Sequence, residues 1–231
     1  MRQIFFDIET TGFDYKIGNR MIEFGAVEVI DRRLTGKTLH FYCNPQGFEV
    51  EPGALNVHGI TNNFLDDKPL FKDNVEEMIE FIRDTEIIAH NGIKFDIPFI
   101  NWELGLLNKQ NKWGVLENVV GKISDSLNLA RTMHPLQKNN LDALCKRYFI
   151  KNDHRHFHGA LLDSELLADV YLAMTGGQTN LSLHNSSLND DSYENLDLSK
   201  IKLRKLSQEA FDITEHDNYL KKILKLEDNL W

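Results

Sequence analysis

Two acidic residues, Asp7 and Glu9, end an apolar stretch near the start of the chain, within the run Phe-Asp-Ile-Glu-Thr-Thr-Gly. Side chains at positions i and i+2 of a β-strand project from the same face, so both carboxylates would be directed at one point. Oxygen ligands in that arrangement suit hard divalent cations such as Mg²⁺ or Mn²⁺. The pair alone is equally compatible with a strand whose polar face carries two acids, so the metal interpretation depends on residues elsewhere.

Three later positions add the side chains that such a site needs. Asp96 lies at the start of an expected helix, where an Asp often serves only as an N-cap. Asp163 would lie one turn into a later helix, where a lone Asp is usually a solvated surface residue. His158 precedes it in a loop that contains glycine. Each position alone has an ordinary structural explanation, and only the combination indicates a catalytic metal site.

The combination closely resembles the three motifs of the DEDDh family of 3′→5′ exonucleases. The matching segments are Phe6–Gly12, His90–Phe99 and His158–Asp163, and their order, spacing and flanking residues agree with the family. The resemblance extends over residues 4–177, is greatest to the proofreading subunits of bacterial DNA polymerase III, and leaves residues 108–121 without a match. It implies a ribonuclease H-like fold, two divalent cations (Mg²⁺ or Mn²⁺) and hydrolysis of the terminal phosphodiester of DNA.

The chemistry of phosphodiester hydrolysis agrees with these residues. Two cations about 3.5–4 Å apart can provide the nucleophile and stabilise the charge on the phosphate and on the leaving oxygen. We expect Asp7 to bridge the two ions, and Asp96 to support the second ion directly or through water. We expect Glu9 and Asp163 to complete the site of the ion that holds the attacking water. Neutral His158 would act as the general base, and its place in a loop would let it move toward that water.

Several neighbours of these residues are expected to contact the 3′-terminal nucleotide. The segment 54–61 looks like the family's loop beside that nucleotide. The predicted substrate-binding residues are Thr10, Thr11, Gly12, His58, Asn91 and Phe95. Phe95 and Phe99 also fit a role in the core, with base stacking as the alternative. His154, His156 and His158 alternate as zinc ligands sometimes do, but the surrounding acids favour a harder ion, so we expect His154 and His156 to be exposed loop residues.

The elements that must position these residues can be read from apolar periodicity. Strands are expected at residues 3–8, 22–30, 34–43 and 86–90. Helices are expected at residues 74–83, 96–107, 139–149 and 159–174, where apolar residues recur three or four positions apart. This order predicts an α/β fold with a mixed central sheet flanked by helices and followed by a flexible C-terminal tail.

The composition changes near residue 177, where Gly176 and Gly177 provide a helix stop. We expect an exonuclease domain over residues 1–177, a clamp-binding motif over 178–183, a flexible linker over 184–210 and a polymerase-binding segment over 211–231. The linker is dense in Asn, Ser and Asp. The last segment has an apolar stripe interleaved with lysines, which fits a partner-binding helix, or a helix that folds back on its own domain.

The partners follow from the resemblance. Gln178, Leu181 and Leu183 resemble the short motif by which bacterial polymerase subunits bind the sliding clamp, although a linker that contains two leucines is the plain alternative. The final segment would bind the catalytic (alpha) subunit of polymerase III. A small accessory subunit is a further possible partner. Two anchors joined by a linker would raise the effective concentration of the exonuclease near the 3′ end of single-stranded DNA.

Composition limits the remaining classes. The 231 residues are 42% hydrophobic and 26% charged, as in a soluble globular protein. Without a membrane-length apolar run or a secretory leader, we expect a cytoplasmic protein. Cys43 and Cys145 have no metal-ligand spacing, and we expect both to be reduced. The net charge of −9 argues against a broad duplex-binding surface, but bound cations would let an acidic protein bind a short strand.

Two other functions remain open at this level. An RNA-trimming member of the same family would use the same metal chemistry, since that chemistry does not distinguish the two sugars. A non-catalytic bridge between clamp and polymerase would keep the C-terminal motifs but would have no need for the five catalytic residues. Release of nucleotides from a 3′ end separates the bridge from both enzymes.

Overall fold

The computed structural model describes residues 1–108, 111–152 and 157–176. The predicted clamp-binding motif at 178–183, the linker at 184–210 and the segment at 211–231 lie outside the described residues, as do His154 and His156. Within the described part of the chain, no helix is long and apolar enough to cross a membrane.

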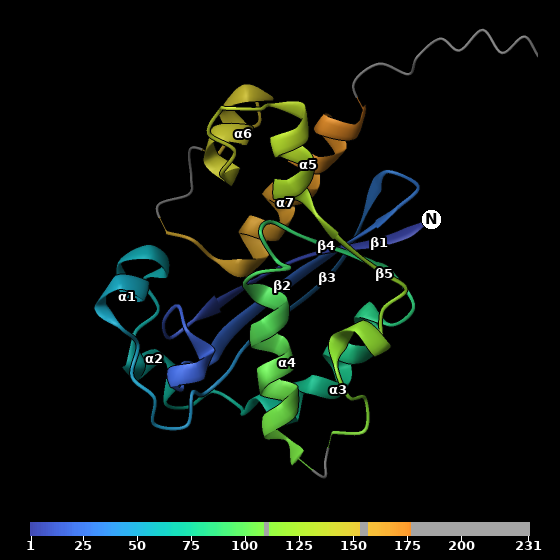
Figure 1. The fold of residues 1–231 in the computed structure, drawn as a ribbon. Coiled ribbons are helices and arrows are strands. Elements are labelled where there is room, and N and C mark those ends of the chain that lie inside the picture. Colours follow the sequence, from blue (N-terminus) through green and yellow to red (C-terminus); the bar gives the residue numbers. More distant parts are fainter. Residues whose placement is uncertain (109–110, 153–156, 177–231) are drawn as a thin grey trace, which may run out of the picture. The chain divides into compact units, whose positions relative to one another are not determined.

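A five-stranded mixed sheet forms the centre of the fold, in the order β3-β2-β1-β4-β5 (Figure 1). The strands are β1 (Arg2–Thr10), β2 (Met21–Ile30), β3 (Arg33–Tyr42), β4 (Glu86–Ala89) and β5 (Lys122–Asp125). β1, β2 and β3 pair antiparallel, whereas β4 runs parallel to both β1 and β5. The predicted mixed sheet is therefore confirmed, with β5 as a strand that the sequence analysis did not predict.

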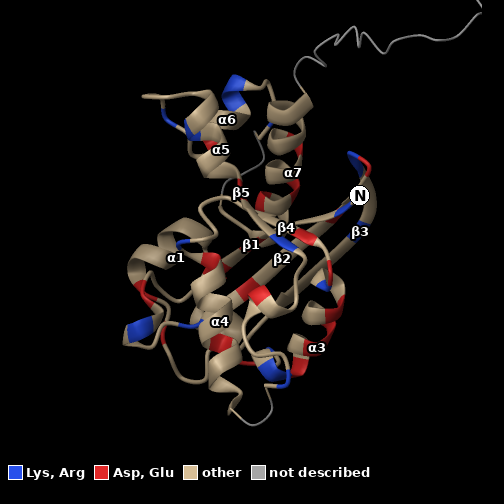
Figure 2. Cartoon of the chain, turned by 45° about the vertical axis from the view of Figure 1, so that its right-hand side comes forward, with Lys and Arg blue, Asp and Glu red and all other residues tan. Residues whose placement is uncertain are grey.

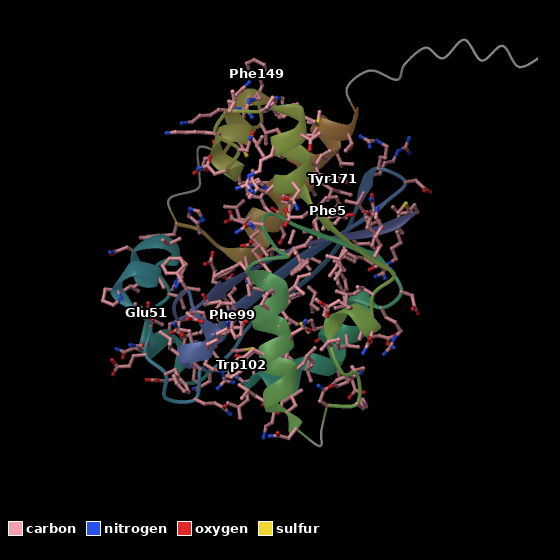
Figure 3. All side chains as sticks on the ribbon, in the orientation of Figure 1. Phe5, Glu51, Phe99, Trp102, Phe149 and Tyr171 are labelled. Carbon is pink, nitrogen blue, oxygen red and sulfur yellow. The ribbon has the colours of Figure 1, made fainter. Side chains whose placement is uncertain are left out.

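Alternating side chains of β1 enter two different cores. Ile4, Phe6 and Ile8 belong to one buried cluster, whereas Phe5 belongs to the cluster on the opposite face. The ring of Phe5 packs edge-on against Tyr171, with 5.3 Å between centroids (Figure 3). Because the period of a strand is two residues, Asp7 and Glu9 continue the row that Phe5 begins.

Helices cover both faces of the sheet. The face of Phe6 is covered by α3 (Phe71–Ile82) and α4 (Asp96–Leu106), with the short turn η3 (Leu116–Asn118) beside them. The face of Phe5 is covered by α5 (Ser126–Met133), α6 (Leu141–Arg147) and α7 (Ala160–Gly176). Residues 108–121, which match no family motif, contribute Leu116 and Val119 to the first core. The helices predicted at 74–83, 96–107, 139–149 and 159–174 are confirmed with small shifts of their ends.

A smaller layer packs beyond one end of the sheet. It contains η1 (Tyr15–Ile17), α1 (Pro52–His58) and α2 (Asn62–Leu65), none of which the sequence analysis predicted as helical. Ala54 and Leu65 pack with Ile22 in a third buried cluster. The two cysteines of the described residues are buried and form no disulfide, in agreement with the expected reduced thiols.

A buried ion pair joins the start of β2 to the middle of α4. Glu103 is 1% exposed and accepts hydrogen bonds from Arg20 at both oxygens, from Nε at 2.8 Å and from Nη2 at 2.7 Å. The amide of Met21 also donates to Glu103 Oε1, at 3.1 Å. This geometry fixes α4, which begins at Asp96, relative to the loop that follows β1.

Candidate metal centre and active site

A cavity of about 250 Å³ opens where β1 and β4 reach their carboxyl ends. In open sheets, ligands commonly bind at this edge. The described residues that line the cavity are Asp7, Ile8, Glu9, His90, Asn91, Phe95, Asp96, Asn140, Leu141, His158 and Asp163. All five predicted metal or catalytic residues and two of the predicted substrate-binding residues, Asn91 and Phe95, therefore surround one space.

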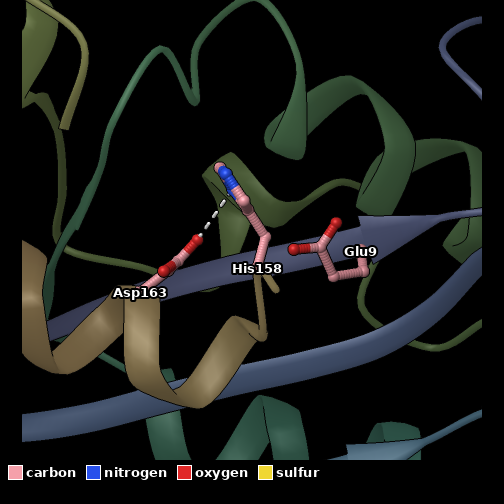
Figure 4. Close-up of side chains that lie close together, drawn as sticks. All are labelled: Glu9, His158 and Asp163. Carbon is pink, nitrogen blue, oxygen red and sulfur yellow. Dashed lines mark ion pairs between the residues drawn. The ribbon is translucent and has the colours of Figure 1, made fainter. Parts of the chain in front are cut away.

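The tightest group of potential metal ligands combines β1 with α7. One ligand atom from each of Glu9, His158 and Asp163 lies within 4.8 Å of the others (Figure 4). The distance from His158 Nδ1 to Asp163 Oδ2 is 3.3 Å. The side chain of Asp163 is only 5% exposed, whereas that of His158 is 43% exposed and comes from the loop before α7. Asp7 and Asp96 line the same cavity but lie outside this tight group.

A glycine on β2 allows α7 to bring Asp163 this close to β1. Gly25 pairs with Asp7 in the sheet, and a Cβ built on it would lie 2.2 Å from the backbone nitrogen of Leu161. Ser164 Oγ donates to the carbonyl oxygen of Gly25 at 2.8 Å, and so ties the first turn of α7 to β2. The backbone of α7 therefore packs directly against β2, which is the neighbour of β1 and its two acidic residues.

Asp96 is the most deeply enclosed of the five residues. Its exposed fraction is 2%, and its Oδ1 has no hydrogen-bond partner among the described residues. Burial, with a smaller contribution from the charge of Asp125, raises the pKa of Asp96 to about 7. A buried carboxylate oxygen without a partner is costly, and a bound cation would offset that cost. The donor set, which is mainly carboxylate oxygen, fits a hard divalent ion.

Four of the predicted substrate-binding residues lie at the end of β1 or against it. Thr10, Thr11, Gly12 and His58 are buried, and none of them is among the described residues that line the cavity. His58 Nε2 donates to the carbonyl oxygen of Thr10 at 3.3 Å, and its Nδ1 accepts from the amide of Ile60 at 2.9 Å. Burial lowers the pKa of His58, and the ring supports the end of β1 through its hydrogen bond to Thr10.

The loop that carries Asn91 is held by a residue that the sequence analysis missed. Asp125 accepts hydrogen bonds from the amides of Asn91 at 3.1 Å and Ile93 at 3.3 Å, which holds the loop that carries Asn91. It also caps α5 by accepting from the amide of Leu127 at 2.9 Å. An Asp that precedes a helix is a recognised start signal, so the cap was the signal available in the sequence.

Two further residues that the sequence analysis missed lie at the start of α5 and immediately before α6. Ser126 Oγ lies 2.8 Å from His90 Nδ1 and donates to the carbonyl oxygen of Ala89, so His90 is held at the end of β4. Asn140, the N-cap of α6, accepts from the amide of Ala143 at 3.1 Å and also lines the cavity. These residues bring α5 and α6 into the site, although neither helix carries one of the four acids or the histidine.

Comparison with known proteins decides the family. The model of the exonuclease family RNase_T matches residues 4–171, most of the chain. The chain belongs to this exonuclease family. DNA polymerase III subunit epsilon of Salmonella typhimurium is 50% identical over 185 residues, which cover 78% of this chain and 74% of that protein. The subunit of the same name from Buchnera aphidicola of Acyrthosiphon pisum is 42% identical over 238 residues, and the match covers 100% of this chain and 98% of that protein.

Solved structures agree on the fold of the family. The zinc-bound Escherichia coli exonuclease I complex with single-stranded DNA superposes with a TM-score of 0.63 at 19% identity, over 77% of this chain. The chain spans 41% of that exonuclease I chain. Exonuclease X in complex with 5′-overhanging duplex DNA gives a TM-score of 0.54 at 22% identity, over 76% of this chain and 90% of that chain. The predicted ribonuclease H-like fold and the 3′→5′ exonuclease class are confirmed, and the family uses divalent metal ions.

Proposed function

We propose that the chain is the proofreading exonuclease of a bacterial replicative DNA polymerase, and that it removes the terminal nucleotide from a frayed 3′ end of DNA. The observation that carries this proposal is the convergence of Asp7, Glu9, Asp96, His158 and Asp163 on one cavity. The likeness to epsilon subunits over the whole chain supports the polymerase context. Mismatched ends fray more readily, so selectivity for errors needs no reading of the base.

In this proposal the four carboxylates hold two divalent cations, Mg²⁺ or Mn²⁺. When bound, such ions activate a water and stabilise charge on the phosphate and the leaving oxygen. Asp7 would be the ligand that both ions share, Glu9 and Asp163 would hold one ion, and Asp96 would support the other. The buried Oδ1 of Asp96, which lacks a hydrogen-bond partner among the described residues, supports its assignment to a cation.

His158 is the proposed general base. With Nδ1 directed at the carboxylate of Asp163, a neutral imidazole accepts a proton at Nε2. The partly exposed loop position gives the ring access to solvent and to substrate. Asn91 and Phe95 line the cavity and are the proposed contacts to the terminal nucleotide. Thr10, Thr11, Gly12 and His58 are proposed to frame the same nucleotide, and the hydrogen bonds of Thr10 and His58 hold the end of β1 in place.

The proposed partners involve the part of the chain after the exonuclease domain at 1–177. Gln178, Leu181 and Leu183 bind the sliding clamp, and residues 211–231 bind the catalytic (alpha) subunit of DNA polymerase III, with residues 184–210 as the linker. A small accessory subunit would bind the exonuclease domain itself. Attachment to partners that already hold the primer end explains how a cytoplasmic protein of net charge −9 reaches DNA.

The experiment is release of mononucleotides from a primer with a 3′ mismatch, measured with Mg²⁺, with Mn²⁺ and with EDTA. We expect metal-dependent release by the wild type, loss of at least a thousandfold in Asp7→Asn, and no change in Glu77→Gln, which removes an exposed acid from α3. Faster degradation of an RNA strand would favour RNA trimming instead. A folded wild type that releases nothing would favour the non-catalytic bridge.

A further inference from the structure

A buried acid that belongs to no motif, Glu23, lies beside the candidate metal centre. It is 2% exposed, and on β2 it is the register partner of Glu9. Directly paired residues of antiparallel strands project from the same face, with Cβ atoms about 4.5–5.5 Å apart. Glu9 lines the cavity and Glu23 is not among the described residues that line it, so Glu23 is a neighbour of the site on the next strand.

The start of α7 packs against Glu23 as well. A Cβ built on Gly159, which separates His158 from the first residue of α7, would lie 4.0 Å from Glu23 Oε1. The charge of Glu23 also acts on the end of β1: burial lowers the pKa of His58, and the negative charge of Glu23 opposes that decrease. Glu23 therefore lies within electrostatic range of several groups that surround the metal centre.

Glu23 lacks the counter-charge that other buried glutamates of the fold have. Glu28, Glu86 and Glu103 each pair with an arginine or a lysine at 2.6–2.7 Å. Among the described residues, Glu23 pairs only with a histidine, with His40 Nε2 lying 2.7 Å from its Oε1. Its Oε2 is buried and has no hydrogen-bond partner in the described part of the chain. The covering helix α7 adds no cation, since it contains three acids and no Lys or Arg (Figure 2).

The neighbour on the third strand does not balance this charge either. Tyr42 is the register partner of Glu23 on β3. Burial raises the pKa of Tyr42 to about 12, and the charge of Glu23 adds to that increase, so the phenol is neutral at physiological pH. Like charges directly opposite each other on a sheet destabilise it, and burial strengthens the repulsion. A divalent cation held by Glu9 would be attracted by both carboxylates and would relieve their repulsion.

We propose that Glu23 is a positioning residue of the metal centre, whose charge strengthens the binding of a divalent cation by Glu9 and Asp163 without contacting the ion. The inference rests on the proposed function, because it concerns an ion that this function requires. The competing explanation is that Glu23 and His40 form a structural bond between β2 and β3. A structural bond would stabilise the metal-free protein, whereas an unbalanced charge destabilises it and favours the metal-bound protein.

The test measures Mn²⁺ binding to the metal-free, full-length protein by isothermal titration calorimetry, together with the melting temperature in EDTA. Glu23→Gln removes the charge and keeps the shape of the side chain. We expect its Kd for Mn²⁺ to rise at least about tenfold, because a unit charge within about 10 Å of a divalent ion interacts strongly at an effective dielectric constant of about 20. Its melting temperature in EDTA should equal or exceed that of the wild type, because the repulsion from Glu9 is removed.

Two further variants separate charge from structure. Glu23→Asp keeps the charge on a shorter side chain, and its Kd should stay within about threefold of the wild-type value. Glu28→Gln is the matched control, because Glu28 is also 2% exposed on β2 but lies five residues away, about 16 Å along the strand. It should leave the Kd unchanged and lower the melting temperature, because Arg2 loses its buried counter-charge.

The outcomes separate this inference from the proposed function. A wild-type Kd in Glu23→Gln, or an equal rise in Kd in Glu23→Asp, would overturn the role of the charge and leave the exonuclease proposal standing. A wild-type Kd together with a lower melting temperature in EDTA would assign Glu23 and His40 to the structural bond. If the wild type neither binds Mn²⁺ nor releases nucleotides with it, the proposed function itself fails.

Discussion

Gly25→Ala is the change that tests most directly how the fold builds the metal site. A Cβ at this position would lie 2.2 Å from the nitrogen of Leu161 and 2.3 Å from the carbonyl carbon of Ala160, where ordinary contacts begin at 3.4 Å. The atoms in the way belong to the helix backbone and cannot rotate aside as a flexible side chain would. The first turn of α7 would have to withdraw by about 1 Å from β2, and Asp163 would withdraw with it.

The structure allows the cost of this change to be worked out. Overpacking a core contact typically costs about 1–3 kcal/mol. Weakening the hydrogen bond from Ser164 to the carbonyl of Gly25 adds about 1 kcal/mol, so we expect a total of about 2–4 kcal/mol. For catalysis, a misplacement of about 1 Å can cost about a hundredfold in rate.

The assay is urea-induced unfolding together with nucleotide release by the remaining folded enzyme. Gly105→Ala is the control, since Gly105 lies in α4 and a Cβ added there would meet no atom within 4 Å, so this variant should gain about 0.5–1 kcal/mol of stability. If Gly25→Ala matched the wild type in both stability and rate, the close approach of α7 would not be what positions Asp163.

Three further predictions concern buried charges. Glu103→Gln should destabilise the protein by about 3–5 kcal/mol in urea unfolding, because it leaves the buried Arg20 without its counter-charge, and a loss below 1 kcal/mol would contradict this. Asp96→Asn should raise the melting temperature in the absence of metal. It should also reduce the stabilisation that Mg²⁺ adds, which in the wild type would be about 2.7 kcal/mol at a Mg²⁺ concentration about a hundred times Kd. Calorimetry with and without Mg²⁺ measures both effects. The pKa of His58 in the folded protein lies below its ordinary value of 6.5, so below that pH the unfolded chain binds more protons than the folded chain does. The stability of the protein should therefore fall as the pH decreases from about 6.5, and it should fall less steeply in His58→Gln.

The parts of the site that the sequence predicted correctly are those that local geometry determines. Two residues apart on a strand means one shared face, so Asp7 and Glu9 could be placed together once a strand was recognised. The apolar spacing of the last helix likewise identified α7 and the turn that carries Asp163. By contrast, β5 was missed because a four-residue strand that ends in Ser-Asp has too little periodicity to be recognised. The short helix α5, which begins at the next residue, was missed with it.

The sequence analysis also did not show the local backbone around Thr10. The motif places Thr10, Thr11 and Gly12 directly after the acids, but β1 bulges between Glu9 and Thr10, where its register with β2 shifts. The buried His58 ring completes the support by hydrogen bonding to the Thr10 carbonyl. A register shift depends on the partner strand and not on local composition, so spacing alone could not show how these residues are buried.

The geometry of the metal centre therefore depends on residues that belong to no motif. Glu9 and Asp163 are far apart in sequence, and their approach requires both a β2 position without a side chain at Gly25 and a hydroxyl on Ser164 that donates to the carbonyl oxygen of Gly25. A chain that kept all five catalytic side chains but carried a larger residue at position 25 would still match the motifs. It would nevertheless hold Asp163 too far from β1 for the two elements to share one ion, so retention of the motifs is necessary for activity but not sufficient.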